Sequence, residues 1–271
     1  MLARSSPGTS NYRTASIMSS QGLLPDTREI IRTLEEASGY PVSFFEDTSL
    51  TVLATIRTGT QTSPIHVIRY RPGEQAPDYQ IAVEVGYALR TFATPPERRF
   101  HLSGDDDRRE NVIAQIKALH PELDSSAAET LGNHLFNGLM LQLRSTPVGL
   151  LVDIWITSHY PRLRGLQAAS LVKQVTDNAQ SLSKEMKNQY PRVIVEGNRA
   201  MNAAQAFFVA DLLNQRQLAV PYRAAGLTSI ATTLLAYVTR DRIAEIDDRD
   251  LITAWAEHLG IAAWVKWLPF N

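Results

Sequence analysis

The apolar positions of residues 27–38 recur every three or four residues, which is the pattern of an amphipathic helix. Asp26 suits the N-cap of this helix, Glu29 completes a capping box with it, and Gly39 suits the C-terminal end. β-Branched and aromatic residues dominate the next part of the chain, with turn residues between the runs. We therefore expect three strands, at 42–45, 51–56 and 65–70.

Beyond Tyr70 the hydrophobic periodicity becomes helical and stays so for most of the remaining chain. Ser126 and Glu129 form a second capping-box pattern, which predicts the start of a long helix. The three strands that end at Tyr70 form the only sheet that the sequence clearly predicts. The helices are expected at 77–92, 104–119, 126–143, 147–158, 164–178, 196–214, 222–239 and 249–259.

The C-terminal run 261–270 is unusually aromatic, because it contains Trp264, Trp267 and Phe270. Exposed aromatic side chains at this density would promote aggregation, so we expect the run to dock onto the core. The alternative is that it stays exposed and serves as a partner-binding peptide.

These patterns predict an α+β fold that is predominantly helical. Residues 24–103 would form a small α+β region with about three strands, and residues 104–271 would form a helical extension. Because no Pro/Gly/Ser-rich linker separates them, we expect the two regions to pack as one continuous body. Residues 1–23 are expected to be a disordered tail, and their Ser/Thr-rich, acid-free start leaves an organellar transit peptide as the alternative.

Composition narrows the class of protein. Hydrophobic residues make up 44% of the 271 residues, which is enough for a sizeable core. The net charge of −1 gives no indication of a nucleic-acid partner, and the absence of cysteine excludes disulfides, thiol nucleophiles and cysteine-bound zinc. No apolar run approaches the roughly 20 residues that span a bilayer, so we expect no membrane contact and a cytoplasmic location. A homodimer is compatible with these numbers.

The stretch that bears on chemistry is the expected helix at 77–92, which contains Val83, Glu84, Val85, Gly86 and Tyr87 in succession. These five residues occupy the frame of an HExxH motif. In that motif two histidines on one helix face bind zinc, and the glutamate beside the first activates the metal-bound water as general base. Here the glutamate position holds Glu84, and the two histidine positions hold Val83 and Tyr87.

The flanks of this helix resemble the ImmA/IrrE metallopeptidases, in particular the longer members of that family. The matching residues are Asp78, Tyr79, Ile81, Ala82, Glu84, Gly86, Ala88, Leu89 and Arg90, followed by Pro95, Pro96, Glu97, Arg98 and Phe100. Two later stretches are also similar: one places Asp153 just before Trp155, and the helical run 201–213 aligns Ala204 with an acidic position of the family. The resemblance implies a zincin-like N-terminal region and a role in regulating repressors or stress responses.

The departures from the family pattern decide the expected chemistry. Catalytic zinc needs three protein ligands with nitrogen, oxygen or sulfur donors. Val83 and Ala204 have no donor atom, and the Tyr87 phenol is a poor ligand at neutral pH. We therefore expect no cofactor. Glu84 would be a remnant general base or a solvated or ion-paired side chain, while Tyr87 would fill the former metal cavity and hydrogen-bond to Glu84.

Asp153 lies in an otherwise apolar helix, so it should be buried enough to require a partner. Arg144 or Arg162 could pair with it, and a remnant metal-ligand role is the alternative. The residues expected to line the vacated peptidase cleft are Asp78, Tyr79, Glu84, Tyr87, Arg90 and Asp153.

Three functions remain open from the sequence. The leading hypothesis is a catalytically inactive metallopeptidase-like protein that binds a protein or peptide in the cleft and acts as a regulator. The second is a hydrolase with a rearranged zinc site, built from Glu84, Asp153 and a histidine outside the helix, with His101 and either His134 or His159 as first choices. The third is a helical interaction module that binds through its C-terminal helices.

Overall fold

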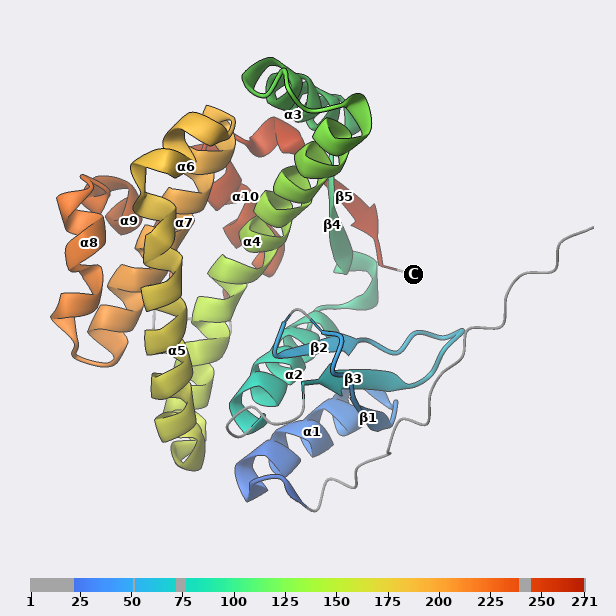
Figure 1. Cartoon of the computed structure of the whole chain (residues 1–271). Coiled ribbons are helices and arrows are strands. Elements are labelled where there is room, and N and C mark those ends of the chain that lie inside the picture. Colours follow the sequence, from blue (N-terminus) through green and yellow to red (C-terminus); the bar gives the residue numbers. More distant parts are fainter. Residues whose placement is uncertain (1–21, 51, 72–76, 239–244, 271) are drawn as a thin grey trace, which may run out of the picture. The chain divides into compact units, whose positions relative to one another are not determined.

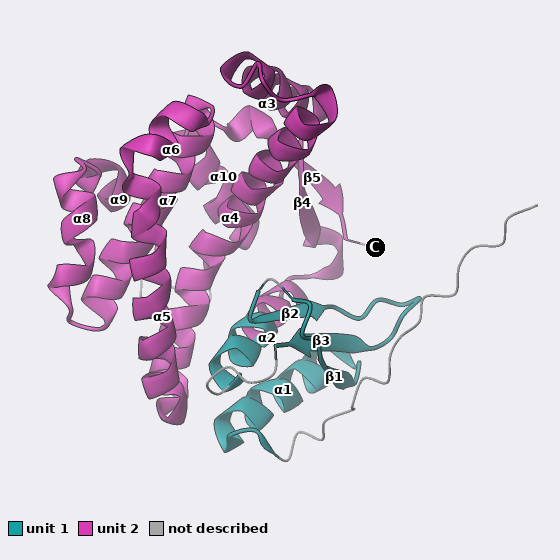
Figure 2. Cartoon of the chain, in the orientation of Figure 1, with its two compact units in different colours: residues 1–85 teal, residues 86–271 magenta. Residues whose placement is uncertain are grey.

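The computed structural model describes residues 22–50, 52–71, 77–238 and 245–270. The chain forms two compact units, residues 1–85 and 86–271, coloured separately in Figure 2. The division falls inside one helix, α2 (Asp78–Ala93), and therefore earlier in the chain than the boundary expected after residue 103. Most of the predicted N-terminal tail lies outside the described residues, while Leu23 near its end is buried.

Unit 1 contains the predicted small sheet. It consists of α1 (Pro25–Ser38), β1 (Val42–Glu46), β2 (Ala54–Arg57), β3 (His66–Tyr70) and the first half of α2 (Figure 1). The strand order is β1-β3-β2, with β1 parallel and β2 antiparallel to β3, so the sheet is mixed. Along β3, His66, Ile68 and Tyr70 are buried on one face, which is the alternation expected of a half-covered sheet.

The start of α1 differs from the prediction. Leu24, not Asp26, is the N-cap residue, and Pro25 occupies the first helical position, where its fixed φ and missing N–H are tolerated. Asp26 lies in the first turn, where its negative charge interacts favourably with the helix dipole. The predicted end is confirmed: Gly39 adopts φ +74° and its N–H donates to the Glu35 carbonyl.

His66 is fully buried in unit 1 and is held in its neutral form. Its Nδ1 accepts the Gly59 N–H at 3.0 Å, so Nε2, 2.9 Å from Ser38 Oγ, carries the proton. Burial lowers the pKa of His66 from 6.5 to about 4.

The unfolded chain binds a proton at His66 below pH 6.5, and the folded chain binds it only near pH 4. The neutral His66 therefore contributes its full stabilisation above pH 6.5. As the pH falls toward 4, the free energy of unfolding should decrease by up to about 3 kcal/mol. Urea unfolding between pH 7.5 and 4.5 measures this loss. His66→Gln keeps an acceptor and a donor but cannot titrate, so it should flatten that part of the pH profile; an unchanged profile would contradict the assignment.

The described residues of unit 2 form helices and, in addition, one two-stranded sheet (Figure 1). Its described elements after α2 are a 3₁₀ turn (Pro96–Arg98), β4 (Phe100–Gly104), α3 (Asp106–Leu119), α4 (Ser125–His159), a 3₁₀ turn (Pro161–Leu163), α5 (Arg164–Asn178), η4 (Ala179–Leu182), α6 (Lys184–Gln189), α7 (Arg192–Leu212), η5 (Arg216–Ala219), α8 (Val220–Ala224), α9 (Thr228–Leu235), α10 (Asp248–His258), a 3₁₀ turn (Ala262–Trp264) and β5 (Val265–Pro269). The predominantly helical character expected from the sequence is confirmed.

The central helix of this unit is α4, a single helix of 35 residues. The predicted interruption before Pro147 is wrong, because that proline lies inside the helix. Proline in a helix interior costs about 3 kcal/mol, and the burial of the flanking Leu143, Val148 and Leu151 outweighs this penalty. The N-cap is Asp124, whose side chain accepts the Ala127 N–H, and not Ser126 as the capping-box pattern suggested.

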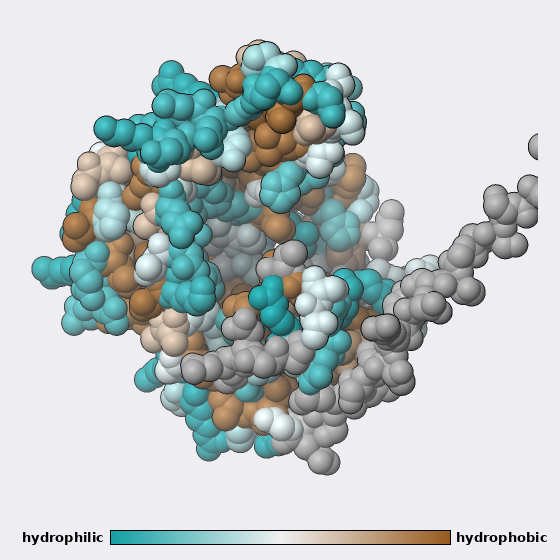
Figure 3. Space-filling view, in the orientation of Figure 1, coloured by the Kyte–Doolittle hydropathy of each residue, from teal (hydrophilic) through white to brown (hydrophobic). Residues whose placement is uncertain are grey.

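The length and composition of α4 would also allow it to cross a membrane. Most of its most apolar stretch is buried inside the protein. Such burial is typical of the core helix of a soluble protein. The exposed large apolar residues are scattered over different elements, and on the face in Figure 3 the outward ridges of the helices are largely hydrophilic.

The pairing of β4 with β5 corrects the prediction of one sheet only. The two strands are antiparallel, with Leu102 opposite Trp267, although more than 150 residues separate them along the chain. The C-terminal run thus docks as expected: Trp264 is buried and stacks on Phe136, with ring centroids 5.5 Å apart.

Two helix boundaries also differ from the prediction. The helix expected at 196–214 begins at Arg192, directly after Pro191. The single helix expected at 222–239 is two short helices, α8 and α9, because Gly226 between them has φ +76° and interrupts the helical hydrogen bonding.

Candidate functional site

Helix α2 carries the five residues in the HExxH frame, so the predicted helical setting of the motif is confirmed. The division between the units passes through the motif, with Val83 and Glu84 in unit 1 and Tyr87 in unit 2. Val83 is half-buried and has no atom that could bind a metal. The contacts of Glu84 and Tyr87 therefore decide what the motif can do.

Glu84 accepts a backbone hydrogen bond from an edge strand of the sheet. Its Oε2 lies 3.0 Å from the N–H of Ile56 in β2. In β2 the peptide groups point alternately toward β3 and away from it, and β2 is the outer strand. The carboxylate thus satisfies a donor that an edge strand would otherwise expose to solvent.

Tyr87 donates its hydroxyl proton to the backbone of α4. The distance from Tyr87 Oη to the Ser145 carbonyl oxygen is 2.8 Å. Gly149 allows this close approach, because a Cβ at that position would lie 2.6 Å from Tyr87 Oη. The sequence predicted a hydrogen bond between Tyr87 and Glu84, and the bond that the structure shows within unit 2 runs from the Tyr87 hydroxyl to the Ser145 carbonyl.

Gly86 also has a packing role. A Cβ at Gly86 would lie 2.5 Å from Cγ1 of Val152 in α4, which is closer than two carbon atoms can approach. The glycine that the family pattern places before the second histidine is therefore required here by the crossing of α2 and α4 within unit 2.

Asp78 supplies the cap that α1 lacks locally. Its Oδ1 accepts the Leu24 N–H at 2.7 Å and the Thr27 hydroxyl at 2.7 Å. Both Asp78 and Thr27 are buried, and neighbouring Tyr79 is only 2% exposed. These contacts tie the start of α2 to the start of α1, and they explain why neither Asp26 nor any other local side chain caps that helix.

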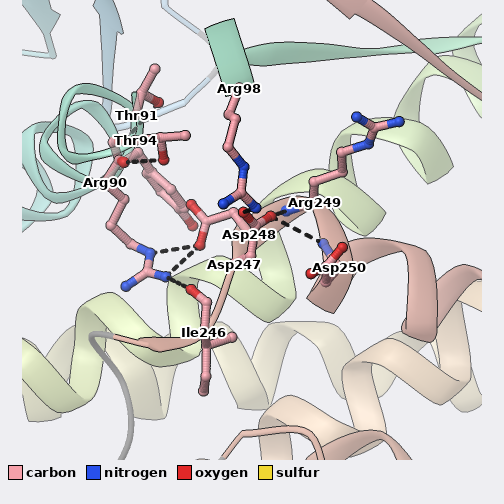
Figure 4. Close-up of polar contacts among 10 residues, drawn as sticks. Arg90, Thr91, Thr94, Arg98, Ile246, Asp247, Asp248, Arg249 and Asp250 are labelled. Carbon is pink, nitrogen blue, oxygen red and sulfur yellow. Dashed lines mark hydrogen bonds and ion pairs between the residues drawn. The ribbon is translucent and has the colours of Figure 1, made fainter. Parts of the chain in front are cut away.

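Arg90 belongs to an ion-pair cluster with the start of α10 (Figure 4). Its Nε donates to Asp248 Oδ1 at 2.7 Å, and its Nη2 donates to the Ile246 carbonyl at 2.8 Å. Burial raises the pKa of Asp248 above its ordinary value, and the Arg90 charge partly opposes that rise. Arg98 pairs at 2.8 Å with Asp247, which also caps α10 by accepting the N–H groups of Arg249 and Asp250.

Asp153 is buried in α4 and is held by a partner that the sequence did not suggest. Gln167 of α5 donates from Nε2 to Asp153 Oδ1 at 2.9 Å and to the Asp153 carbonyl at 3.0 Å. Thr157 donates to Gln167 Oε1 and fixes the orientation of that amide. Ala204, the other aligned acidic position, is fully buried in α7.

The residues expected to line the cleft are divided between the two units. Asp78, Tyr79 and Glu84 belong to unit 1, and Tyr87, Arg90 and Asp153 belong to unit 2. Across the ranges that the structure describes, no group of three or more His, Asp or Glu side chains is arranged to hold a metal. Comparison of the chain with protein-family models, with curated proteins and with solved structures finds no match.

Proposed function

We propose that this chain is a non-catalytic, metallopeptidase-like protein with a zincin-like N-terminal region, and that it binds a protein or peptide partner as a regulator. The observation that carries the proposal is the hydrogen bond from Ile56 N–H to Glu84. A general base must accept a proton from the nucleophilic water. The hydrogen bond from the Ile56 N–H in β2 gives this carboxylate a structural role and orients it toward the sheet.

The residues at the aligned metal positions do not suit zinc. Val83 and Ala204 contribute no donor atom, and the hydroxyl of Tyr87 is engaged with Ser145. Asp153 is bound by the Gln167 amide. A zinc site needs three protein ligands around the metal, so the resemblance to the ImmA/IrrE group extends to its chain pattern and not to its chemistry.

The outer edge of β1 is the surface best suited to an extended peptide. The Asp47 N–H donates to the Tyr70 carbonyl, so the odd-numbered residues of this segment face β3 and the even-numbered ones face outward. The Val42 N–H is taken by Glu35 of α1 at 2.8 Å. The outward peptide groups of Phe44 and Glu46 could pair with an added strand, which is a common mode of peptide recognition.

Substitutions at Glu84 test its structural role. Glu84→Ala should lower the free energy of unfolding by about 1–3 kcal/mol, because it leaves the Ile56 N–H without its acceptor. Glu84→Gln retains an acceptor oxygen and should recover most of that loss. Urea unfolding of both variants measures the difference. Equal stability of all three proteins would show that the hydrogen bond does not support the fold.

Peptide display followed by direct binding and cleavage assays tests the function. We expect peptides that bind without being cut, with an affinity that neither EDTA nor Glu84→Gln changes. Glu46→Pro should abolish binding, because it removes the outward N–H at β1, whereas Glu46→Ala keeps that N–H and should bind normally. Circular dichroism would confirm that the proline variant is folded. Cleavage that EDTA or Glu84→Gln abolishes would refute the proposal.

A further inference from the structure

Arg199 in α7 is a buried cation without a counter-charge. Its side chain is 7% exposed, and its Nε is completely buried with no hydrogen-bond partner. Within the described part of the chain, no carboxylate or other acceptor forms an ion pair or hydrogen bond with its guanidinium group. Arginine keeps its charge at any pH at which the protein is folded, so this residue cannot become neutral to avoid the cost of burial.

Most other buried polar groups of the described residues have partners, and the exception among uncharged groups is the hydroxyl of Tyr222, which is buried without a hydrogen bond. Thr27 and Asp78 bond to each other, His66 to Gly59 and Ser38, Asp153 to Gln167, and Asn202 to Gln142, Asn198 and Ser181. Arg109 also has a buried Nε without an acceptor, but it pairs with Asp106 and lies over the Phe136 ring. Among the buried charged side chains of the described residues, Asp78 and Asp153 thus have partners, whereas Arg199 has none.

The residues that follow Arg199 on its face of α7, and those of the neighbouring helix α9, include no carboxylate within unit 2. On its own helix, Ala203, Ala206 and Ala210 follow at spacings that share its face, and all are buried. Helix α9, which packs against α7, contains no acidic residue, and its only polar side chains are the hydroxyls of Thr and Ser. Asn198 and Asn202, which flank Arg199 in the sequence of α7, are committed to the amide network with Gln142.

An uncompensated buried charge costs several kcal/mol, so a site of this kind is best explained by an anion that binds there. We infer that Arg199 forms the centre of an oxyanion-binding site in unit 2. The ligand is a phosphate, sulfate or carboxylate group, which a guanidinium fork can hold through two parallel hydrogen bonds. Because so little of the side chain reaches solvent, the group that enters is a free ion or the end of a small molecule.

Thermal unfolding in an anion-poor buffer tests this site directly. Adding inorganic phosphate to about 100-fold above its dissociation constant should raise the Tm of the wild type by roughly 5 °C. Parallel titrations with sulfate and acetate separate a tetrahedral oxyanion from a carboxylate. Arg199→Met should have the same Tm as the wild type or a higher one without phosphate, because it removes the unpaired charge, and it should not respond to any of the anions.

Two further variants test whether the response to anions depends on the guanidinium group of Arg199. Arg192→Met changes an exposed arginine of the same helix, so it should respond to phosphate as the wild type does. Arg199→Lys keeps the positive charge without the planar fork and should weaken phosphate binding at least about tenfold. The inference is overturned if no anion stabilises the wild type, or if Arg199→Met or Arg199→Lys retains the full response.

Discussion

Replacing Phe136 with alanine is expected to lower the stability of unit 2 by about 4 kcal/mol, the range observed for fully buried phenylalanines. Phe136 has no exposed surface. Its ring stacks on Trp264 at 5.5 Å and lies beneath the guanidinium of Arg109 at 5.0 Å. Gly104 of β4 packs directly against the ring and has no space for a Cβ. One side chain thus connects α3, α4, β4 and the C-terminal run.

Urea unfolding followed by tryptophan fluorescence would measure this loss, because Trp264 reports on the same contact. Hydrogen exchange should show that the β4–β5 pair loses protection first in Phe136→Ala. Phe207→Ala is the matched control: that ring is only half-buried, and its recorded ring contact is with Arg223, so a loss of about 1 kcal/mol is expected. Similar losses in the two variants would contradict the central role given to Phe136.

Gly86→Ala should cost about 2–3 kcal/mol, even though alanine is the better helix former. The added Cβ would lie 2.5 Å from Val152 Cγ1 and 3.5 Å from Val152 Cβ, so α2 and α4 would have to separate. Gly138→Ala is the control in α4. It has no atom within 4 Å of the new Cβ, and it should stabilise the protein by about 0.5–1 kcal/mol.

A double-mutant cycle with Val152→Ala isolates this contact. Shortening Val152 removes the clashing methyl groups, so Gly86→Ala should cost at least about 1 kcal/mol less in the Val152→Ala background. Additive effects would mean that Gly86 is required for another reason, such as access of a substrate to the motif.

The secondary structure was predictable where a local pattern dominates. The amphipathic helices, the three strands of unit 1 and the αL glycine at Gly39 all follow from residue spacing. Three features did not, because their causes lie far away in the sequence. The α1 cap comes from Asp78, the packing of α4 keeps Pro147 inside a helix, and β4 acquires its partner from the end of the chain.

In the candidate site, too, some features could be predicted from the sequence and others could not. The sequence was sufficient to show that Val83 offers no ligand, and that Asp153 in an apolar helix needs a partner. It could not identify Gln167, because one glutamine among many carries no local signal. The roles of Ile56 and Ser145 were equally hidden, since each acts through a backbone group that any residue possesses. At α10 a signal was available: Asp247, followed by two further acidic residues, is a recognisable helix start.

The central claim is that the HExxH frame of α2 serves the fold and binds no metal. Zinc content is the most direct test, measured by mass spectrometry on protein expressed with added zinc and freed of loosely bound metal. We expect well under one zinc per chain, with no change in Glu84→Gln or Asp153→Asn. Close to one zinc per chain in the wild type, reduced in either variant, would contradict the account and establish a rearranged metal site.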